Sequence, residues 1–74
     1  MKQGVILCAP ECCKVRFDLE EFSDELRCGT CLDVMVGNRW KPSRLEMDWL
    51  EDRWYLVDIH TNDINGLRVR TYDE

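Results

Sequence analysis

The chain has 74 residues, a length that limits it to a single small domain. A core of this size rarely supplies more than about 3–5 kcal/mol of net stability. A hydrophobic content of 45% and a charged content of 34% are typical of a soluble globular domain and exclude a disordered chain. The net charge of −5 disfavours nucleic-acid binding and favours a protein partner.

Two short strands open the chain. Residues 5–8 are apolar, residues 9–11 read as a turn, and residues 13–19 alternate between apolar and polar, so this region predicts a β-hairpin. We expect Val15, Phe17 and Leu19 to face inward, and if Val5 and Leu7 do so too, Cys8 and Cys12 point to the same side. The apolar run at residues 5–9 is too short for a signal sequence or a membrane span, which predicts a cytoplasmic location.

An acidic segment, DLEEFSDE, follows at residues 18–25. It holds five carboxylates and no basic residue, so its charge equals the net charge of the whole chain. The spacing of its apolar residues suits one short helical turn packed on the barrel, and the alternative is a long acidic loop. We call its carboxylates the acidic strip: Asp18, Glu20, Glu21, Asp24 and Glu25.

Three apolar runs between Leu32 and Ile59 predict a three-stranded antiparallel meander that carries the core. Gly37-Asn38 accepts positive φ and favours a tight turn between the first two runs. Because Pro42 has no N–H to donate, the second strand should be irregular or lie at an edge over residues 40–43. We expect the inward residues of the three strands to include Val34, Leu45 and Val57.

Residues 67–71 predict a last strand, which makes six in all. Short strands separated by turns indicate an all-β fold over residues 1–74, a small antiparallel and partly open barrel with at most one short helical turn. An SH3-like topology is the first choice and an OB-like topology the second. In an SH3-like closure the last strand returns to pair near the first.

Several phrases of the sequence are similar to those of a known family. They are RFDL at 16–19, LRCG at 26–29, WKPSRLE at 40–46, WYLV at 54–57 and NGLRVR at 65–70. On these phrases, over roughly residues 14–71, the chain resembles a family catalogued as domain of unknown function five-three-four-eight, carried by phages and integrative conjugative elements. Small proteins of such elements include inhibitors of host defence such as anti-CRISPR proteins. The resemblance therefore implies a host CRISPR effector nuclease as a class of partner.

Five cysteines give the sharpest chemical signal. In the cytosol, cysteines favour metal binding or free thiols over disulfides. Cys28-Gly29-Thr30-Cys31 has the spacing of a zinc knuckle, and Cys8 and Cys12 flank the first hairpin turn at a ligand spacing. The resemblance adds no support, since the family pattern has a cysteine only at the position of Cys28. We predict a structural zinc site with the ligands Cys8, Cys12, Cys28 and Cys31.

Three alternatives to this ligand set stay open. The opposite strand register exchanges Cys12 for Cys13. The cysteines can instead be buried free thiols that pack as small apolar residues. A redox dithiol at Cys28 and Cys31 is disfavoured, because that chemistry needs a βαβ setting that the chain is too short to build.

No catalytic residues are predicted. His60 is the only histidine, so Ser23 and Ser43 have no second histidine with which to form a nucleophile and base. We therefore expect a small, acidic, non-enzymatic protein that binds a partner protein through the acidic strip and Trp40. The resemblance implies that this partner is a host nucleic-acid-binding defence protein, which the chain would inhibit. The alternative is a nucleic-acid-binding barrel, with bases stacked on Trp40, Trp54 or Tyr72. Its basic face would comprise Lys14, Arg16, Arg68 and Arg70.

Overall fold

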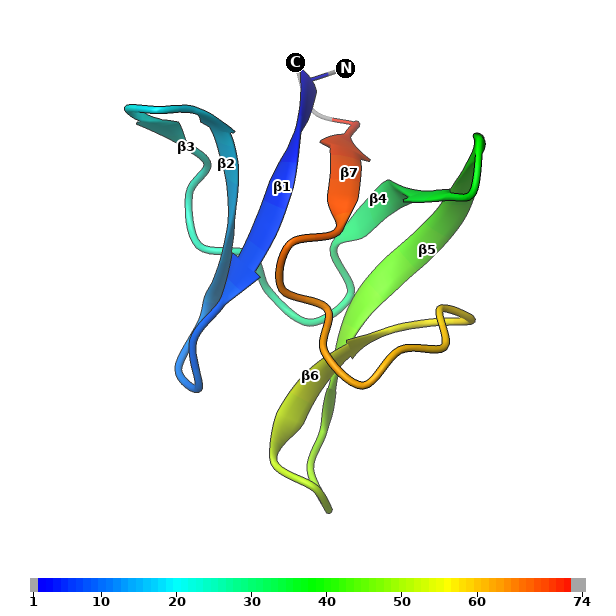
Figure 1. Ribbon diagram of the computed structural model, residues 1–74. Coiled ribbons are helices and arrows are strands. Elements are labelled where there is room, and N and C mark those ends of the chain that lie inside the picture. Colours follow the sequence, from blue (N-terminus) through cyan, green and yellow to red (C-terminus); the bar gives the residue numbers. More distant parts are fainter. Residues whose placement is uncertain (1, 73–74) are drawn as a thin grey trace.

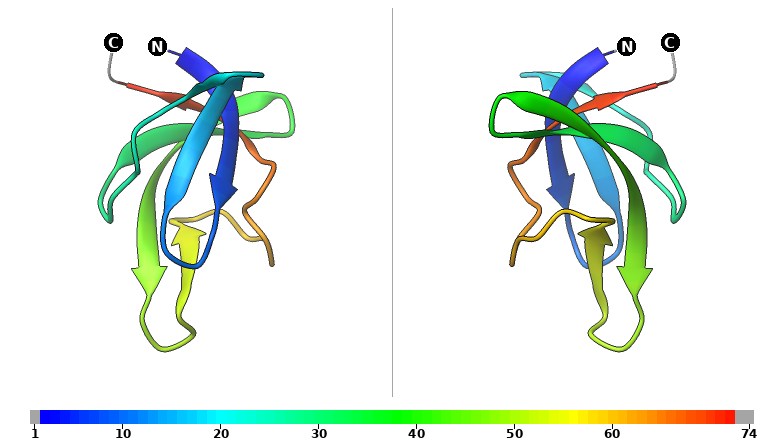
Figure 2. Two further views of the ribbon diagram at one scale, coloured as in Figure 1. Left: turned by 90° about the vertical axis from the view of Figure 1, so that its left-hand side faces the viewer. Right: turned by 90° about the vertical axis from the view of Figure 1, so that its right-hand side faces the viewer.

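The computed structural model describes residues 2–72, so the very ends of the expected domain lie outside it, and its regular secondary structure consists of seven β-strands. They pair in one antiparallel sheet in the order β3-β2-β1-β7-β4-β5-β6, which curls on itself (Figures 1 and 2). The prediction of an all-β, partly open antiparallel barrel is confirmed. The strands are β1 (Lys2–Cys8), β2 (Cys13–Asp18), β3 (Glu21–Phe22), β4 (Cys31–Val36), β5 (Arg39–Asp48), β6 (Arg53–Leu56) and β7 (Arg68–Thr71).

The last strand joins the two halves of the sheet. Val69 on β7 lies opposite Gly4 on β1 and opposite Val34 on β4. This return of the last strand to the first is the closure expected of an SH3-like order. Gly4 permits the curl, because a Cβ at this position would lie 2.4 Å from the carbonyl oxygen of Arg16.

The central meander follows the sequence-based expectation. Gly37 takes a φ of 63° in the turn between β4 and β5. Pro42 lies opposite Asp33 on β4, in a part of β5 that β6 does not reach, because the pairing of β5 with β6 begins at Leu45. Pro42 therefore lies at an edge, as predicted.

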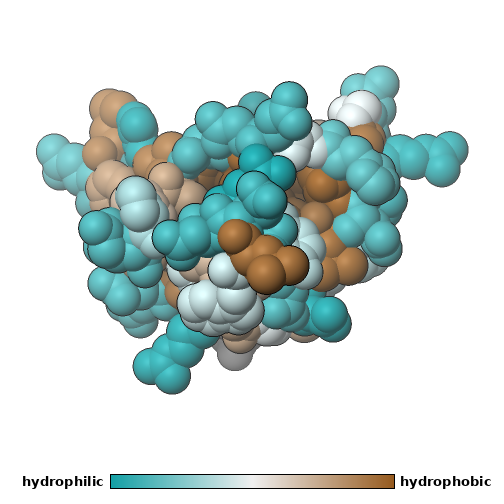
Figure 3. Space-filling model, turned by 90° about the horizontal axis from the view of Figure 1, so that it is seen from below, coloured by the Kyte–Doolittle hydropathy of each residue, from teal (hydrophilic) through white to brown (hydrophobic). Residues whose placement is uncertain are grey.

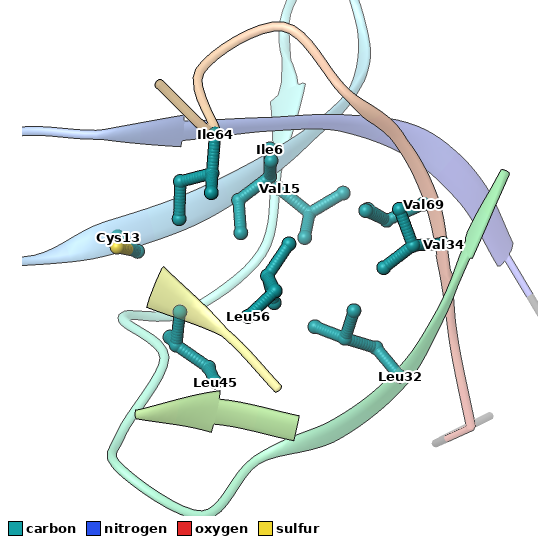
Figure 4. Packing of buried hydrophobic residues seen from close by; sticks show 9 residues of the cluster. All are labelled: Ile6, Cys13, Val15, Leu32, Val34, Leu45, Leu56, Ile64 and Val69. Atoms are coloured by element: carbon teal, nitrogen blue, oxygen red, sulfur yellow. The ribbon is translucent and has the colours of Figure 1, made fainter. Parts of the chain in front are cut away.

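The core lies inside the curled sheet, and residues from both hairpins and the last strand meet there (Figure 4). Val34 and Leu45 are fully buried as predicted. The prediction for Val57 was wrong by one residue: β6 ends at Leu56, which faces Leu45 and is 1% exposed. The buried apolar residues are Ile6, Cys13, Val15, Leu32, Val34, Leu45, Leu56, Ile64 and Val69.

The first hairpin has the opposite register from the one expected. Ile6 lies opposite Val15 and is fully buried, whereas Leu7 is 37% exposed. Val5 and Leu7 therefore face outward, and Leu19, also expected inward, is 77% exposed. Because residues 5–7 are all apolar, alternation carries no information about which face they present.

Residues 18–25 form no helical turn. A bulge between Arg16 and Asp18 leads into the two-residue strand β3, so the loop alternative is the better description. The Ser23 N–H donates to the Val15 carbonyl at 2.8 Å, and the Ser23 hydroxyl accepts from the Val15 N–H at 2.9 Å. These bonds hold the segment flat against β2. No helix long and apolar enough to cross a membrane is present in residues 2–72.

Candidate functional site

The acidic strip follows an open edge of the sheet, because β3 is the outermost strand on that side (Figure 1). All five of its carboxylate residues are exposed. Glu21 forms an ion pair with Lys2, and Asp18 Oδ1 accepts a hydrogen bond from the Leu19 N–H at 2.7 Å. Within residues 2–72, Glu20, Asp24 and Glu25 have no ion-pair partner. The strip therefore presents largely uncompensated negative charge.

Two large apolar side chains are exposed among these carboxylates. Leu19 is 77% exposed and Phe22 is 51% exposed. Phe22 lies opposite Arg16 on β2, so the two side chains share the outer face of the sheet. A purely solvating acidic face has no need of exposed leucine and phenylalanine, and apolar residues among charges are typical of interaction surfaces.

A basic surface lies beside the strip on the outer face. Arg16 on β2 and Arg68 on β7 both lie opposite Val5 on β1, and Lys14 lies opposite Leu7. A shallow groove of about 570 Å³ follows this row. We call it the basic groove, with the principal lining residues Val5, Leu7, Arg16, Asp18, Leu19 and Arg68. The predicted basic face grouped Lys14, Arg16, Arg68 and Arg70 on the condition that β2 and β7 pair, but β1 lies between these two strands.

Arg70 was predicted in the basic face and Trp40 in the partner-binding surface, but the two side chains contact each other instead. The Arg70 guanidinium donates to Asp33 at 2.8 Å and lies 4.5 Å from the Trp40 ring centroid. Trp40 is therefore half-buried beneath a cation instead of free for a partner or for base stacking. Trp54 is also half-buried and packs against the core. Of the proposed stacking residues, Tyr72 is 43% exposed, and its hydroxyl donates to Asp33.

Asp33 on β4 is a buried carboxylate on the outer face of the sheet. It is 4% exposed. The hydrogen bond from Tyr72 lowers its pKa, and the hydrogen bond and positive charge of Arg70 act in the same direction, against the opposing effect of burial. The same bond from Tyr72 raises the pKa of the tyrosine. No short-range signal marks this cluster, because Asp33 and Arg70 are 37 residues apart.

The cysteines do not assemble as predicted. Cys8 and Cys13 lie directly opposite each other on β1 and β2 and form a disulfide bond. The register therefore selects Cys13 over Cys12, and the expectation of reduced thiols or metal ligands was wrong for this pair. Cys12 is free and half-buried, while Cys28 and Cys31 are free and exposed. In the part of the chain that the structure describes, no group of three or more His, Cys, Asp or Glu residues could hold a metal ion.

The knuckle-like turn at residues 28–31 is nevertheless anchored close to this disulfide. Leu26 forms a β-bridge with Cys13, and its N–H donates to the Cys13 carbonyl at 2.8 Å. The Gly29 N–H donates to the Leu45 carbonyl at 2.7 Å. The turn is thus held between β2 and β5, with both of its thiols exposed.

The sequence patterns did not predict the exposed apolar tip of the hairpin formed by β5 and β6. Trp49 and Leu50, in the turn between β5 and β6, are 76% and 96% exposed. Seen from below, hydrophobic surface protrudes at the centre of a largely hydrophilic face (Figure 3). The Asp48 carboxylate accepts hydrogen bonds from the N–H groups of Leu50 and Glu51 at 3.0 and 3.2 Å, which fixes the turn. The sequence contains a signal for this tip, because Trp49 and Leu50 lie between charged residues in a turn and their side chains cannot reach the core from there.

Comparisons with known proteins agree with this architecture without giving a function. A crystal structure of a protein from Ruminococcus gnavus, determined by the Northeast Structural Genomics Consortium, superimposes with a TM-score of 0.82. It is 42% identical, and the alignment covers 95% of this chain and 100% of that one. No curated protein matches the chain. Residues 9–71 match the family described as Domain of unknown function (DUF5348). The chain therefore belongs to the DUF5348 family.

Proposed function

We propose that this protein is a non-enzymatic binding protein that contacts a basic surface of another protein with its acidic strip. The observation that carries the proposal is the exposure of five carboxylates along one sheet edge, most of them without a cationic partner in residues 2–72. The exposed Phe22 side chain in the same segment would supply the apolar burial that charge alone does not. Acidic surfaces of this kind steer association with basic partners and set specificity.

The class of partner follows from the phage and mobile-element setting that the resemblance implies. A protein that binds nucleic acid presents a basic channel, and carboxylates along an edge can lie where phosphates would lie. We therefore propose inhibition of a host nucleic-acid-binding defence protein, with a CRISPR effector nuclease as the first candidate. Its site of action would then be the host cytoplasm.

The test compares two double variants of equal net charge. Asp24→Lys with Glu25→Lys reverses the end of the strip away from the basic groove, where the structure describes no ion pair for either side chain. Glu11→Lys with Glu51→Lys reverses two exposed carboxylates elsewhere. Each double variant has a net charge of −1, because every reversal adds two charges to the wild-type value of −5. A difference between them therefore reports position, not overall charge.

Binding to purified CRISPR effector nucleases from a bacterium that carries the gene should be measured together with inhibition of DNA cleavage. We expect the strip variant to bind at least about tenfold more weakly, or about 1.4 kcal/mol, while the control variant binds as the wild type does. Affinity should also fall as ionic strength rises, since exposed charges are screened. Equal binding by the two variants would show that the strip is not the interface.

A further inference from the structure

The basic groove and the acidic turn beside it have complementary patterns. Across the groove, Arg16, Val5 and Arg68 form a row of cation, apolar residue and cation on three adjacent strands. Along the turn, Asp18, Leu19 and Glu20 form a sequence of anion, apolar residue and anion. Leu19 is 77% exposed and has no apolar cover of its own. A leucine between two carboxylates fits an apolar floor between two arginines.

We propose that the occupant of the basic groove is the Asp18–Glu20 turn of a second copy of this chain. Leu19 of one copy would lie over Val5 and Leu7 of the other, with its flanking carboxylates against Arg16 and Arg68. No ion pair within residues 2–72 engages either arginine, so both are free to bind a second chain. The contact would cover exposed apolar surface on both copies.

The position of the turn makes this contact reciprocal. Asp18 and Leu19 line one wall of the same groove that the partner's turn would enter. A two-fold axis through this patch therefore sets each turn against the other copy's groove, which is the self-complementary arrangement of a cyclic dimer. A turn remote from the groove would instead build an open chain of molecules.

The charge around the groove disfavours a nucleic acid as occupant. A phosphate backbone entering between Arg16 and Arg68 would meet Asp18 on the groove wall, and Glu20 and Glu21 just beyond it. The whole chain also carries a net charge of −5. A second copy brings these repelling carboxylates into favourable contacts. The proposal goes beyond the proposed function and does not depend on it, because the Asp24 and Glu25 end of the strip is not needed for the dimer.

Two charge-reversed variants and their mixture test the dimer. The groove variant is Arg16→Glu with Arg68→Glu, and the turn variant is Asp18→Lys with Glu20→Lys. Each alone would set like charges against like and should be monomeric at concentrations where the wild type dimerises. Mixed in equal amounts, they restore opposite charges at both contacts and should form a heterodimer. Arg39→Glu with Arg53→Glu changes the net charge as the groove variant does at exposed positions elsewhere, and it should remain dimeric.

Analytical ultracentrifugation over a concentration series gives the readout, with thermal melts to confirm that each variant is folded. Wild-type dimers should weaken in about 1 M salt, where the Debye length is about 3 Å. A wild type that stays monomeric at high concentration and low salt overturns the proposal, whatever the variants do. A mixture that remains monomeric, or an Arg39 and Arg53 variant that dissociates equally, also overturns it. Binding of a single-stranded oligonucleotide by a wild-type monomer, lost in the groove variant, would assign the groove to nucleic acid instead.

Discussion

The Tyr72 hydroxyl donates a hydrogen bond to the Asp33 carboxylate, just beyond the end of the last strand. Arg70 donates a second bond to the same carboxylate from within β7. Asp33 is on β4, so the network fastens the last strand to the meander on the outer face of the sheet. Two hydrogen-bond donors offset most of the desolvation free energy of a buried, charged carboxylate. When one donor is lost, that part of the desolvation penalty is no longer offset and the folded state is destabilised.

Stability should therefore depend on pH at both extremes. The folded pKa of Asp33 lies below its ordinary value near 3.8, so its contribution is present above about pH 4 and is lost as the pH falls through the lowered value. The folded pKa of Tyr72 lies above its ordinary value near 10.0, so its contribution is present below pH 10 and is lost as the pH rises through the raised value. Melting temperatures measured across this range should form a plateau between the two limits.

Two variants test whether Asp33 and Tyr72 set the acid and alkaline limits of this plateau. Asp33→Asn should cost about 1–3 kcal/mol at neutral pH, because it weakens the bonds to Tyr72 and Arg70 in a buried position. Tyr72→Phe should cost less, since the tyrosine is 43% exposed, and should remove the alkaline limb of the profile. An unchanged alkaline limb in Tyr72→Phe would show that another group causes it.

The core register can be tested at β5 and β6. Leu45→Ala should cost roughly 2–5 kcal/mol, comparable to the whole stability of a domain of this size. Leu56→Ala should cost a similar amount, because the two leucines face each other and are both buried. Val57→Ala should cost much less, since this residue lies just beyond β6 and is only half-buried. Chemical denaturation gives the three values, and a larger loss for Val57→Ala than for Leu56→Ala would contradict the register.

The disulfide predicts a response to reduction. Its two cysteines are five residues apart, and closing so short a loop stabilises the folded state by about 2 kcal/mol in the chain-entropy description. Reductant should therefore lower the melting temperature of the wild type, and Cys8→Ser should abolish this response. Cys12→Ser should retain it. Thiol labelling of the denatured, unreduced protein should modify Cys12, Cys28 and Cys31, and labelling of all five cysteines would contradict the bond.

Zinc binding stays a prediction, now limited to the reduced chain. While Cys8 and Cys13 are bonded to each other, neither can act as a thiolate ligand. After reduction we expect about one zinc per chain, held by these two thiols with Cys28 and Cys31, although these four cysteines must first move together because no three of them form a metal-holding group in residues 2–72. Cys28→Ser should lose the metal and Cys12→Ser should keep it. Reduced protein that takes up no zinc would leave these cysteines with packing and disulfide roles only.

Local sequence patterns correctly predicted the strands in which apolar and polar residues alternate and the structure buries the apolar ones. Val34 and Leu45 were placed correctly because their strands alternate cleanly, and Pro42 was placed at an edge because it lacks an N–H. The register of β1 could not be predicted, because residues 5–7 are uniformly apolar and fit either face. That single ambiguity also decided which cysteine would face Cys8.

The sequence shows the charged residues of the acidic strip and of the basic groove, but it does not show that these two surfaces lie side by side. The acidic strip is contiguous in the sequence and could be read directly. The basic groove depends on β1 lying between β2 and β7, an arrangement set by the pairing of strands far apart in the chain. The removal of Arg70 from that surface by Asp33 and Trp40 is likewise a long-range effect that no local spacing reveals.

The placement of β7 between β1 and β4 has a consequence for how the protein is made. The sheet edges of β1 and β4 that β7 covers stay open until residues 68–71 leave the ribosome, although all six other strands have emerged by then. Native pairing of β1 and β4 with β7 must therefore wait for residues 68–71, and until then the nascent chain carries two unpaired edges that can pair with other chains. Translation that ends before residue 68 would yield an aggregation-prone product, not a smaller folded one.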